Sequence, residues 1–233
     1  MRDYDTGPAP EEPARPARTP EEPARPARIG QTAEDIASPA PLGLNVLAFA
    51  TAILGCFYAG FIIPYQGLGI RPAVGAVLIV LGIVLIVAGI LEYRRNSMVS
   101  ATIFASYGGF LAAIGLVFLP NLGILGFLLA TGELNFAMGL FFLCWTIFAA
   151  ILFIGSLKTN ISLAATMGIL VLAYLLLTIG QLASNNSILN HVGGWLAIVA
   201  ALAAWYTGLA SLLSSSDPNM AARLLGSRMT PVE

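Results

Sequence analysis

Six long apolar stretches constrain the fold of this chain more than any other feature of its sequence. Each is long enough to cross the roughly 30 Å hydrocarbon core of a bilayer as a helix. Because lipid offers no hydrogen bonds, a crossing segment must satisfy its own backbone, as a helix does. The predicted transmembrane helices span residues 43–65, 73–92, 100–119, 134–156, 161–183 and 193–213.

Charged residues are too few and too unevenly placed for a soluble domain. Only 10% of the 233 residues are charged, against roughly 25% in typical globular proteins. Eight of the 12 acidic residues lie in the first 35 positions, and only ten charged side chains follow residue 35. We therefore expect an all-α integral membrane protein, a six-transmembrane-helix bundle embedded in the lipid bilayer.

The predicted bundle, residues 38–213, lies between two polar tails. The tail over residues 1–37 contains the segment EEPARPAR twice, and such a Pro- and charge-rich repeat buries too little apolar surface to fold. We predict a disordered N-terminal tail and a short C-terminal tail over residues 214–233. A further apolar stretch, residues 122–130, is short for a bilayer span and is expected to be lipid-facing or re-entrant.

Basic residues predict the orientation of the bundle. With both termini in the cytoplasm, ten Lys and Arg residues lie inside and Arg71 alone lies outside. Without the five arginines of the N-terminal tail the ratio is still five to one, as the positive-inside rule requires. We therefore expect both tails to be cytoplasmic.

Stripes of small residues predict where the helices pack against one another. In lipid, helices associate through close backbone approach rather than through the hydrophobic effect. Two stripes are expected to form helix–helix seams. They are Gly75, Gly82 and Gly89 in the second predicted helix, and Ala197, Ala201, Ala204 and Gly208 in the sixth.

A few polar side chains fall within or next to the predicted helices, where they are costly and therefore informative. Thr51, Ser106 and Tyr107 fit either a pathway with hydrogen-bond donors or plain interhelical hydrogen bonds. Glu92 fits a proton or ion site, or a salt bridge with the arginines that follow it. His191, just before the sixth predicted helix, fits a satisfied interfacial residue or a proton relay.

Catalytic, metal-binding and nucleic-acid-binding patterns are missing from the sequence. It contains no nucleophile elbow, no HExxH and no Walker loop. Cys56 and Cys144 do not have metal-ligand spacing, and no basic patch or motif indicates nucleic acid. We expect no enzymatic activity, no cofactor, no metal and no nucleic-acid partner.

A short motif before the first predicted helix resembles the signature of a transporter family. Residues 38–44 read SPAPLGL, close to the NPAPLGL signature of the acetate uptake transporter family, which includes bacterial succinate–acetate permeases and yeast acetate and ammonia-export proteins. The residues of the motif are Ser38, Pro39, Ala40, Pro41, Leu42, Gly43 and Leu44. Other landmarks follow in the family's order: AGILEY (88–93), SYG (106–108), LPNLG (119–123), GSLK (155–158) and GW (194–195).

The resemblance implies a bundle that assembles as a homo-hexamer, with a pathway for small monocarboxylates through each protomer. The narrowest point in the family is an apolar constriction of Phe, Tyr and Leu. By position the Tyr is Tyr107 and the Leu is Leu170, whereas Leu47 replaces the Phe. Two further departures from the family pattern are Ser38 in place of Asn and Leu85 in place of a Gln common in the second helix.

The function implied by this resemblance is a plasma-membrane transporter or channel for acetate and related small carboxylates, with succinate as a second candidate. Transport in the family is usually described as proton-coupled, and channel-like passage is the competing description. Two other functions remain open. One is an ammonium or ammonia transporter, and the other is a non-transporting scaffold that binds partners through its Pro-rich tail.

Overall fold

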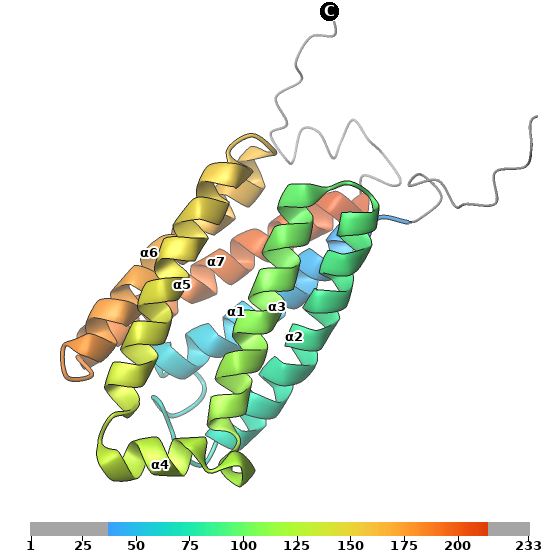
Figure 1. Cartoon of the computed structure of the whole chain (residues 1–233). Helices are drawn as coiled ribbons and strands as arrows, with labels where there is room; N and C mark the ends of the chain where they lie inside the picture. The colour runs from blue at the N-terminus through green and yellow to red at the C-terminus, as the bar shows by residue number, and fades with distance from the viewer. Residues whose placement is uncertain (1–36, 214–233) are drawn as a thin grey trace, which may run out of the picture.

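The computed structural model describes residues 37–213 as a bundle of helices (Figure 1). Within these residues, six helices are long and apolar enough to cross a membrane, which confirms the all-helical, six-span prediction. The predicted tails lie outside the described residues. The six helices are α1 (Ala40–Ala59), α2 (Arg71–Arg94), α3 (Met98–Phe118), α5 (Leu134–Ser156), α6 (Ile161–Leu182) and α7 (Ser187–Leu213).

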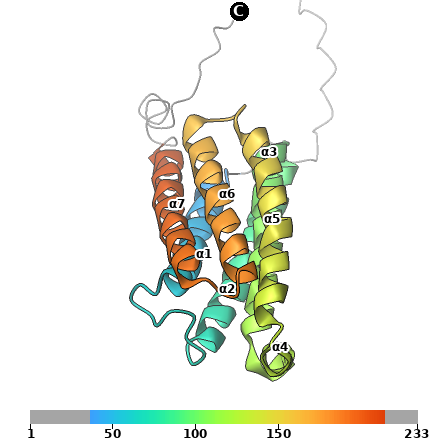
Figure 2. The same cartoon turned by 90° about the vertical axis from the view of Figure 1, so that its left-hand side faces the viewer.

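The bundle has two distinct ends. Helix α1 begins and helix α7 finishes at one end, here called the termini end, and α4 (Ile124–Thr131) lies at the other, here called the α4 end (Figure 1). A short 3₁₀ turn, η2 (Pro120–Leu122), precedes α4. The apolar stretch over residues 122–130 therefore forms a short helix that crosses the end of the bundle beneath α5 and does not enter it (Figure 2).

Two helix boundaries differ from the predicted ones by about six residues. Helix α1 ends at Ala59 rather than at 65, because Gly60 adopts a left-handed conformation (φ 64°) that stops a helix. Helix α7 begins at Ser187 rather than at 193, because the side chain of Asn186 accepts the Leu189 N–H (3.2 Å) and caps the helix. His191 consequently lies inside α7 and not before it.

Glycines bring the backbones of α2 and α3 into direct contact. A methyl group added to Gly82 would lie 2.6 Å from the carbonyl oxygen of Gly108, so neither helix tolerates a side chain there. The glycine seam predicted on α2 is therefore confirmed, and α3 contributes glycines of its own. The facing pairs are Gly75 with Gly115, Gly82 with Gly108, and Gly89 with Ala105.

The second predicted stripe packs α7 against α1. Ala197, Ala201 and Ala204 are buried, and Gly208 faces the side chain of Asn45 on α1. Gly194, one turn before Ala197 on α7, touches the backbone of α1 so closely that no side chain fits. At both seams the helix backbones touch directly, without bulky side chains between them, as expected for helices that associate in lipid.

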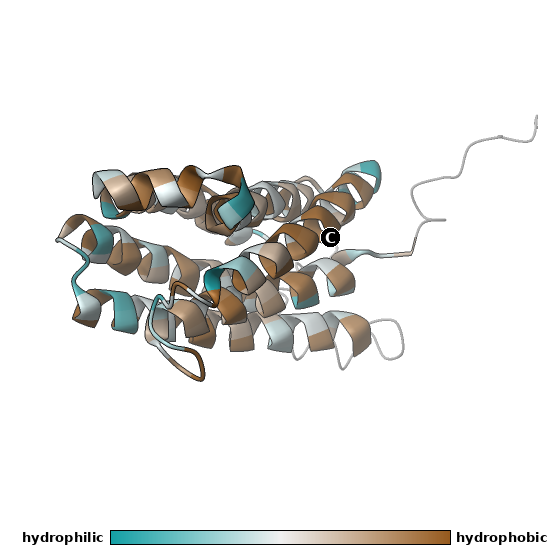
Figure 3. Cartoon of the chain, turned by 90° about the horizontal axis from the view of Figure 1, so that it is seen from below, coloured by the Kyte–Doolittle hydropathy of each residue, from teal (hydrophilic) through white to brown (hydrophobic). Residues whose placement is uncertain are grey.

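The helices consist largely of apolar residues (Figure 3), and many of these residues are exposed on the outside of the bundle. On α2, for example, Val80, Ile83 and Val87 are about half exposed. A soluble monomer rarely exposes contiguous apolar surface of this kind. The chain is therefore a multi-pass membrane protein whose apolar exterior faces lipid or neighbouring chains.

Replacing Gly108 by Ala is expected to destabilise the bundle by roughly 1–3 kcal/mol, because the new methyl group would lie 2.5 Å from the Gly82 carbonyl oxygen. Gly109→Ala is the matched control, since nothing lies within 4 Å of its added methyl group. Thermal unfolding in detergent should show a lower midpoint for Gly108→Ala alone. Equal midpoints would contradict the seam.

Candidate functional site

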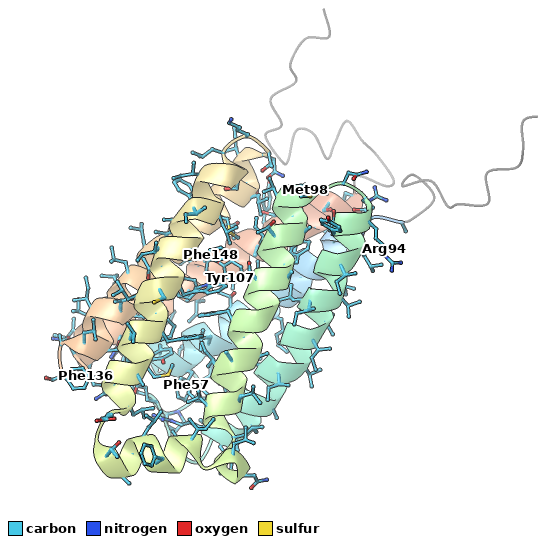
Figure 4. All side chains as sticks on the ribbon, in the orientation of Figure 1. Phe57, Arg94, Met98, Tyr107, Phe136 and Phe148 are labelled. Carbon is cyan, nitrogen blue, oxygen red and sulfur yellow. The ribbon has the colours of Figure 1, made fainter. Side chains whose placement is uncertain are left out.

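Aromatic side chains fill the space between α3 and α5 at the centre of the bundle. Phe110 stacks on Trp145 with ring centroids 4.4 Å apart, and Tyr107 meets the same indole edge-on at 5.3 Å. Tyr174 from α6 completes the group, 5.3 Å from Phe110. Tyr107 points into the interior between the two helices (Figure 4). The centre of the bundle is therefore built from side chains of three helices.

The aromatic rings continue from this centre toward the α4 end. Tyr174 stacks near Phe142 (6.1 Å between centroids), and Phe142 meets Tyr58 at 5.5 Å. Tyr58 in turn contacts Phe57 at 5.3 Å, and Figure 4 shows Phe57 closer than Tyr107 to the α4 end. We call this chain of rings, from Tyr107 to Phe57, the aromatic column.

The three residues of the implied constriction lie in one buried core. Leu47 and Tyr107 are 0% exposed and Leu170 is 1% exposed, and all belong to the same hydrophobic cluster. They come from α1, α3 and α6, which all begin at the termini end. Tyr174, one turn beyond Leu170, lies 6.4 Å from Tyr107 between ring centroids. Their role as a constriction stays a prediction.

Three polar atoms in this core make no hydrogen bond of good geometry among the described residues, although the Tyr107 hydroxyl lies within interaction range of the polar groups of Trp145 and Tyr174. They are the hydroxyl oxygens of Thr51 and Tyr107 and the indole nitrogen of Trp145. Leaving such a group unpaired in an apolar interior costs about 1–3 kcal/mol. Thr51 lies one turn beyond Leu47, and Trp145 touches Tyr107. These groups are placed to donate hydrogen bonds to a small acceptor that enters the core.

Trp145 is a residue that the sequence analysis missed. An apolar helix contains tryptophans for many reasons, and spacing does not single out one of them. Ser106, which the sequence analysis did name, behaves differently, because its hydroxyl donates to the carbonyl oxygen of Thr102 (2.5 Å) within α3. The geometry therefore favours Thr51, Tyr107 and Trp145 over Ser106 as donors.

A small cavity of about 80 Å³ lies at the termini end, on the approach to the predicted constriction. Leu44, Phe104 and Leu163 line it, one or two turns before Leu47, Tyr107 and Leu170 on the same helices. The remaining lining residues are Ala40, Ser100, Ile103, Asn160, Thr207 and Ser211.

The SPAPLGL motif forms one wall of this cavity. Ala40 and Leu44 line it directly. The Phe104 ring lies against Gly43 so closely that a methyl group there would be 2.5 Å from it, which explains the glycine. Ser38, the residue that departs from the signature, accepts a hydrogen bond from the Ala40 N–H at 3.4 Å. Its hydroxyl oxygen therefore keeps a contact at the start of the helix.

Three helices begin around the cavity, at Ala40, Met98 and Ile161. The N-terminus of a helix carries a partial positive charge of about half an elementary charge. Asn160 caps α6 by accepting the Leu163 N–H at 2.7 Å. Three positive helix ends face one negative end, that of α7 at Thr207 and Ser211, so the helix dipoles around the cavity favour an anion on balance.

Glu92 is buried near the same end, with 3% of its surface exposed. One carboxylate oxygen has no hydrogen-bond partner among the described residues, whereas Arg94 is exposed and points away from the bundle (Figure 4). Leu85, two turns earlier on α2, is fully buried and apolar. Glu92 is therefore a buried carboxylate with one oxygen unpaired among the described residues, and its role as an ion or proton site stays a prediction.

The Tyr107→Phe variant tests whether the hydroxyl of Tyr107 contributes to transport or to stability. Because the hydroxyl makes no hydrogen bond of good geometry among the described residues, its loss should change the free energy of unfolding, read from thermal unfolding, by less than about 1 kcal/mol. If substrate accepts its hydrogen bond, uptake should fall several-fold. Tyr93→Phe, at an exposed position, is the control and should change neither quantity. A clear loss of stability in Tyr107→Phe would contradict the unpaired hydroxyl.

Comparisons with known proteins agree with this architecture. The chain is 31% identical to the succinate-acetate/proton symporter SatP of Escherichia coli over 181 residues, which covers 77% of the chain and 90% of SatP. It is 32% identical to acetate permease A of Emericella nidulans (79% of the chain, 64% of the permease). It is 31% identical to ammonia transport outward protein 2 of Saccharomyces cerevisiae (78% and 63%).

A solved structure and a family profile complete the comparison. The structure of the bacterial acetate channel SatP superposes with a TM-score of 0.67 at 26% identity, covering 85% of this chain and 99% of that one. The chain spans just under two thirds of the length of its yeast and fungal relatives. The profile of the GPR1/FUN34/yaaH family matches residues 23–224. The chain therefore belongs to the GPR1/FUN34/yaaH family, a family of transporters and channels and not of enzymes.

Proposed function

We propose that this protein carries acetate and related small carboxylates, succinate among them, across the plasma membrane through a pathway inside each protomer. The observation that carries the proposal is a pair of neighbouring donors in an apolar core, Tyr107 and Trp145, that make no hydrogen bond of good geometry among the described residues. An ionised carboxylate only accepts hydrogen bonds, so it complements such donors. The printed names of three relatives, which refer to acetate or succinate, support the same class of substrate.

The pathway runs along the bundle axis. We place the α4 end outside and the termini end in the cytoplasm, because Arg94, Arg95 and Lys158 lie at the termini end. A carboxylate that enters from outside follows the aromatic column, crosses the constriction at Tyr107 and reaches the cavity at the termini end. There the three helix N-termini stabilise its negative charge.

Burial at the constriction favours proton coupling. Leu47, Tyr107 and Leu170 leave almost no exposed surface, so an acid that passes between them gives up its hydration shell. The neutral acid loses far less solvation energy than the anion. Glu92, buried with an unpaired oxygen, is the proton-exchanging group on the cytoplasmic side. The printed names of the relatives include both a proton symporter and a channel, so the assignment of proton coupling rests on the burial of the constriction.

The homo-hexamer implied by the family resemblance is part of the proposal, and apolar surface on α1, α2 and α7 offers a place for contact between protomers. An open groove of about 410 Å³ between these helices is lined without polar surface, by residues that include Phe49, Ile53, Val74 and Trp205. A neighbouring protomer covers such a groove better than disordered lipid chains do, because close packing drives association in a bilayer.

Ammonium transport is the second hypothesis, and it fits the same site less well than carboxylate transport does. A cation requires acceptors along its route, and the indole N–H of Trp145 is a donor only. The unpaired groups in the core therefore complement an anion or a neutral acid. The printed name of the yeast relative keeps ammonia as the second candidate.

Uptake of labelled acetate by proteoliposomes tests the proposal. Purified protein should take up acetate above empty liposomes, and an inward proton gradient should increase the initial rate several-fold. Glu92→Gln should abolish this increase while leaving gradient-free uptake within about twofold. Glu133→Gln, at an exposed position outside the column, is the matched control. A monodisperse, thermally stable preparation without uptake would refute the carboxylate pathway.

A further inference from the structure

Among residues 37–213, Arg71 is a buried cation that has no anionic partner, and it lies at the α4 end. It is the first residue of α2 and only 5% exposed. Residues 37–213 contain two acids. Glu92 lies at the other end of the same helix, about 30 Å away at 1.5 Å per residue, and Glu133 is exposed at the start of α5. A buried charge is normally paired, so an unpaired one calls for a ligand.

The guanidinium group of Arg71 lies over two neighbouring aromatic rings, whose centroids are 5.2 Å apart. Its central carbon lies 5.6 Å from the centroid of Phe57 and 5.5 Å from that of Phe118. Nη2 donates to the carbonyl oxygen of Gln66 at 3.3 Å, and the buried Nε has no partner among the described residues. The Nε–H group is therefore a buried donor available to an acceptor, and a guanidinium group matches a planar, two-oxygen acceptor.

The loop between α1 and α2 fixes this arrangement. The backbone N–H of Gln66 bonds the carbonyl oxygen of Phe57 at 3.2 Å, and its side chain donates to Asn185 at 3.0 Å. Asn190 donates to the hydroxyl of Tyr65 at 3.0 Å. Burial raises the pKa of Tyr65, partly offset by this bond, so the hydroxyl stays neutral. The carbonyl oxygen of Gln66, which accepts the hydrogen bond from Arg71, thus belongs to an ordered hydrogen-bond network.

Arg71 lies where the aromatic column ends. Phe57, the last ring of the column, is one of the two rings that hold the guanidinium. We propose that Arg71 is the outer anion-binding residue of the pathway, where it takes the carboxylate of an incoming small monocarboxylate and repels cations such as ammonium. This inference rests on the proposed function and adds the recognition step at the outer entrance. The ligand that we expect at Arg71 is a carboxylate that approaches from outside the membrane.

A purely structural role for Arg71 makes a different prediction. Cation–π contacts with Phe57 and Phe118 alone would contribute to folding, so their loss would lower stability and leave substrate affinity unchanged. Anion binding at the entrance requires a change in the concentration dependence of uptake. The Michaelis constant for external acetate therefore separates the two roles.

The test measures initial uptake by proteoliposomes over a range of external acetate concentrations. Arg71→Gln should raise the KM for acetate about tenfold, with the maximal rate within about twofold, because the attracting charge and the donors are lost. Arg71→Lys keeps the charge without the forked donors and should raise KM about threefold. Arg94→Gln, an exposed arginine at the opposite end, is the matched control and should leave KM unchanged.

Each outcome decides the proposal. An unchanged KM in a folded Arg71→Gln variant, with normal wild-type uptake, overturns the role of Arg71 and leaves the proposed function standing. If Arg71→Gln does not fold, Arg71→Lys decides alone, and an unchanged KM there overturns the proposal. Absence of uptake in the wild type and in every variant overturns the proposed function, and with it this inference.

Discussion

Close backbone contact between helices is the interaction on which the rest of the structure depends. In lipid, apolar side chains gain little by meeting one another, so helices must associate through tight packing. Gly82 and Gly108 join α2 to α3, and Gly194 joins α7 to α1. These seams draw the helices into close pairs and leave the centre, between α3, α5 and α6, to be filled by aromatic side chains. The candidate pathway runs through this side-chain-filled centre.

The centre combines an apolar wall with unsatisfied donors, and its two ends carry positive potential. Tyr107 and Trp145 hold hydrogen-bond donors that make no bond of good geometry among the described residues. Helix N-termini surround the cavity at the termini end, and Arg71 closes the column at the α4 end. Apolar walls strengthen each of these electrostatic effects because they exclude water. The whole arrangement suits a small, singly charged acid better than a cation.

Sequence patterns predicted the membrane spans and the α2 seam, because both depend on local composition and helical spacing. They missed the end of α1 at Gly60 and the start of α7 after Asn186, where one residue's conformation or cap decides the boundary. The resemblance to a family identified Leu47, Tyr107 and Leu170, which the structure gathers in one core. It did not identify Trp145 or a binding role for Arg71. Their significance lies in missing partners, and only the packed fold shows which groups lack one.

The most direct test of a pathway through this core uses the size of the side chain at position 47. Leu47 is fully buried beside the column, so Leu47→Phe should narrow the passage. Uptake of acetate, propionate, butyrate and valerate by proteoliposomes measures the effect. The account predicts that the variant keeps acetate uptake within a few-fold and loses the longer acids at a shorter chain length than the wild type. An unchanged chain-length profile in a folded variant would show that substrate does not pass Leu47.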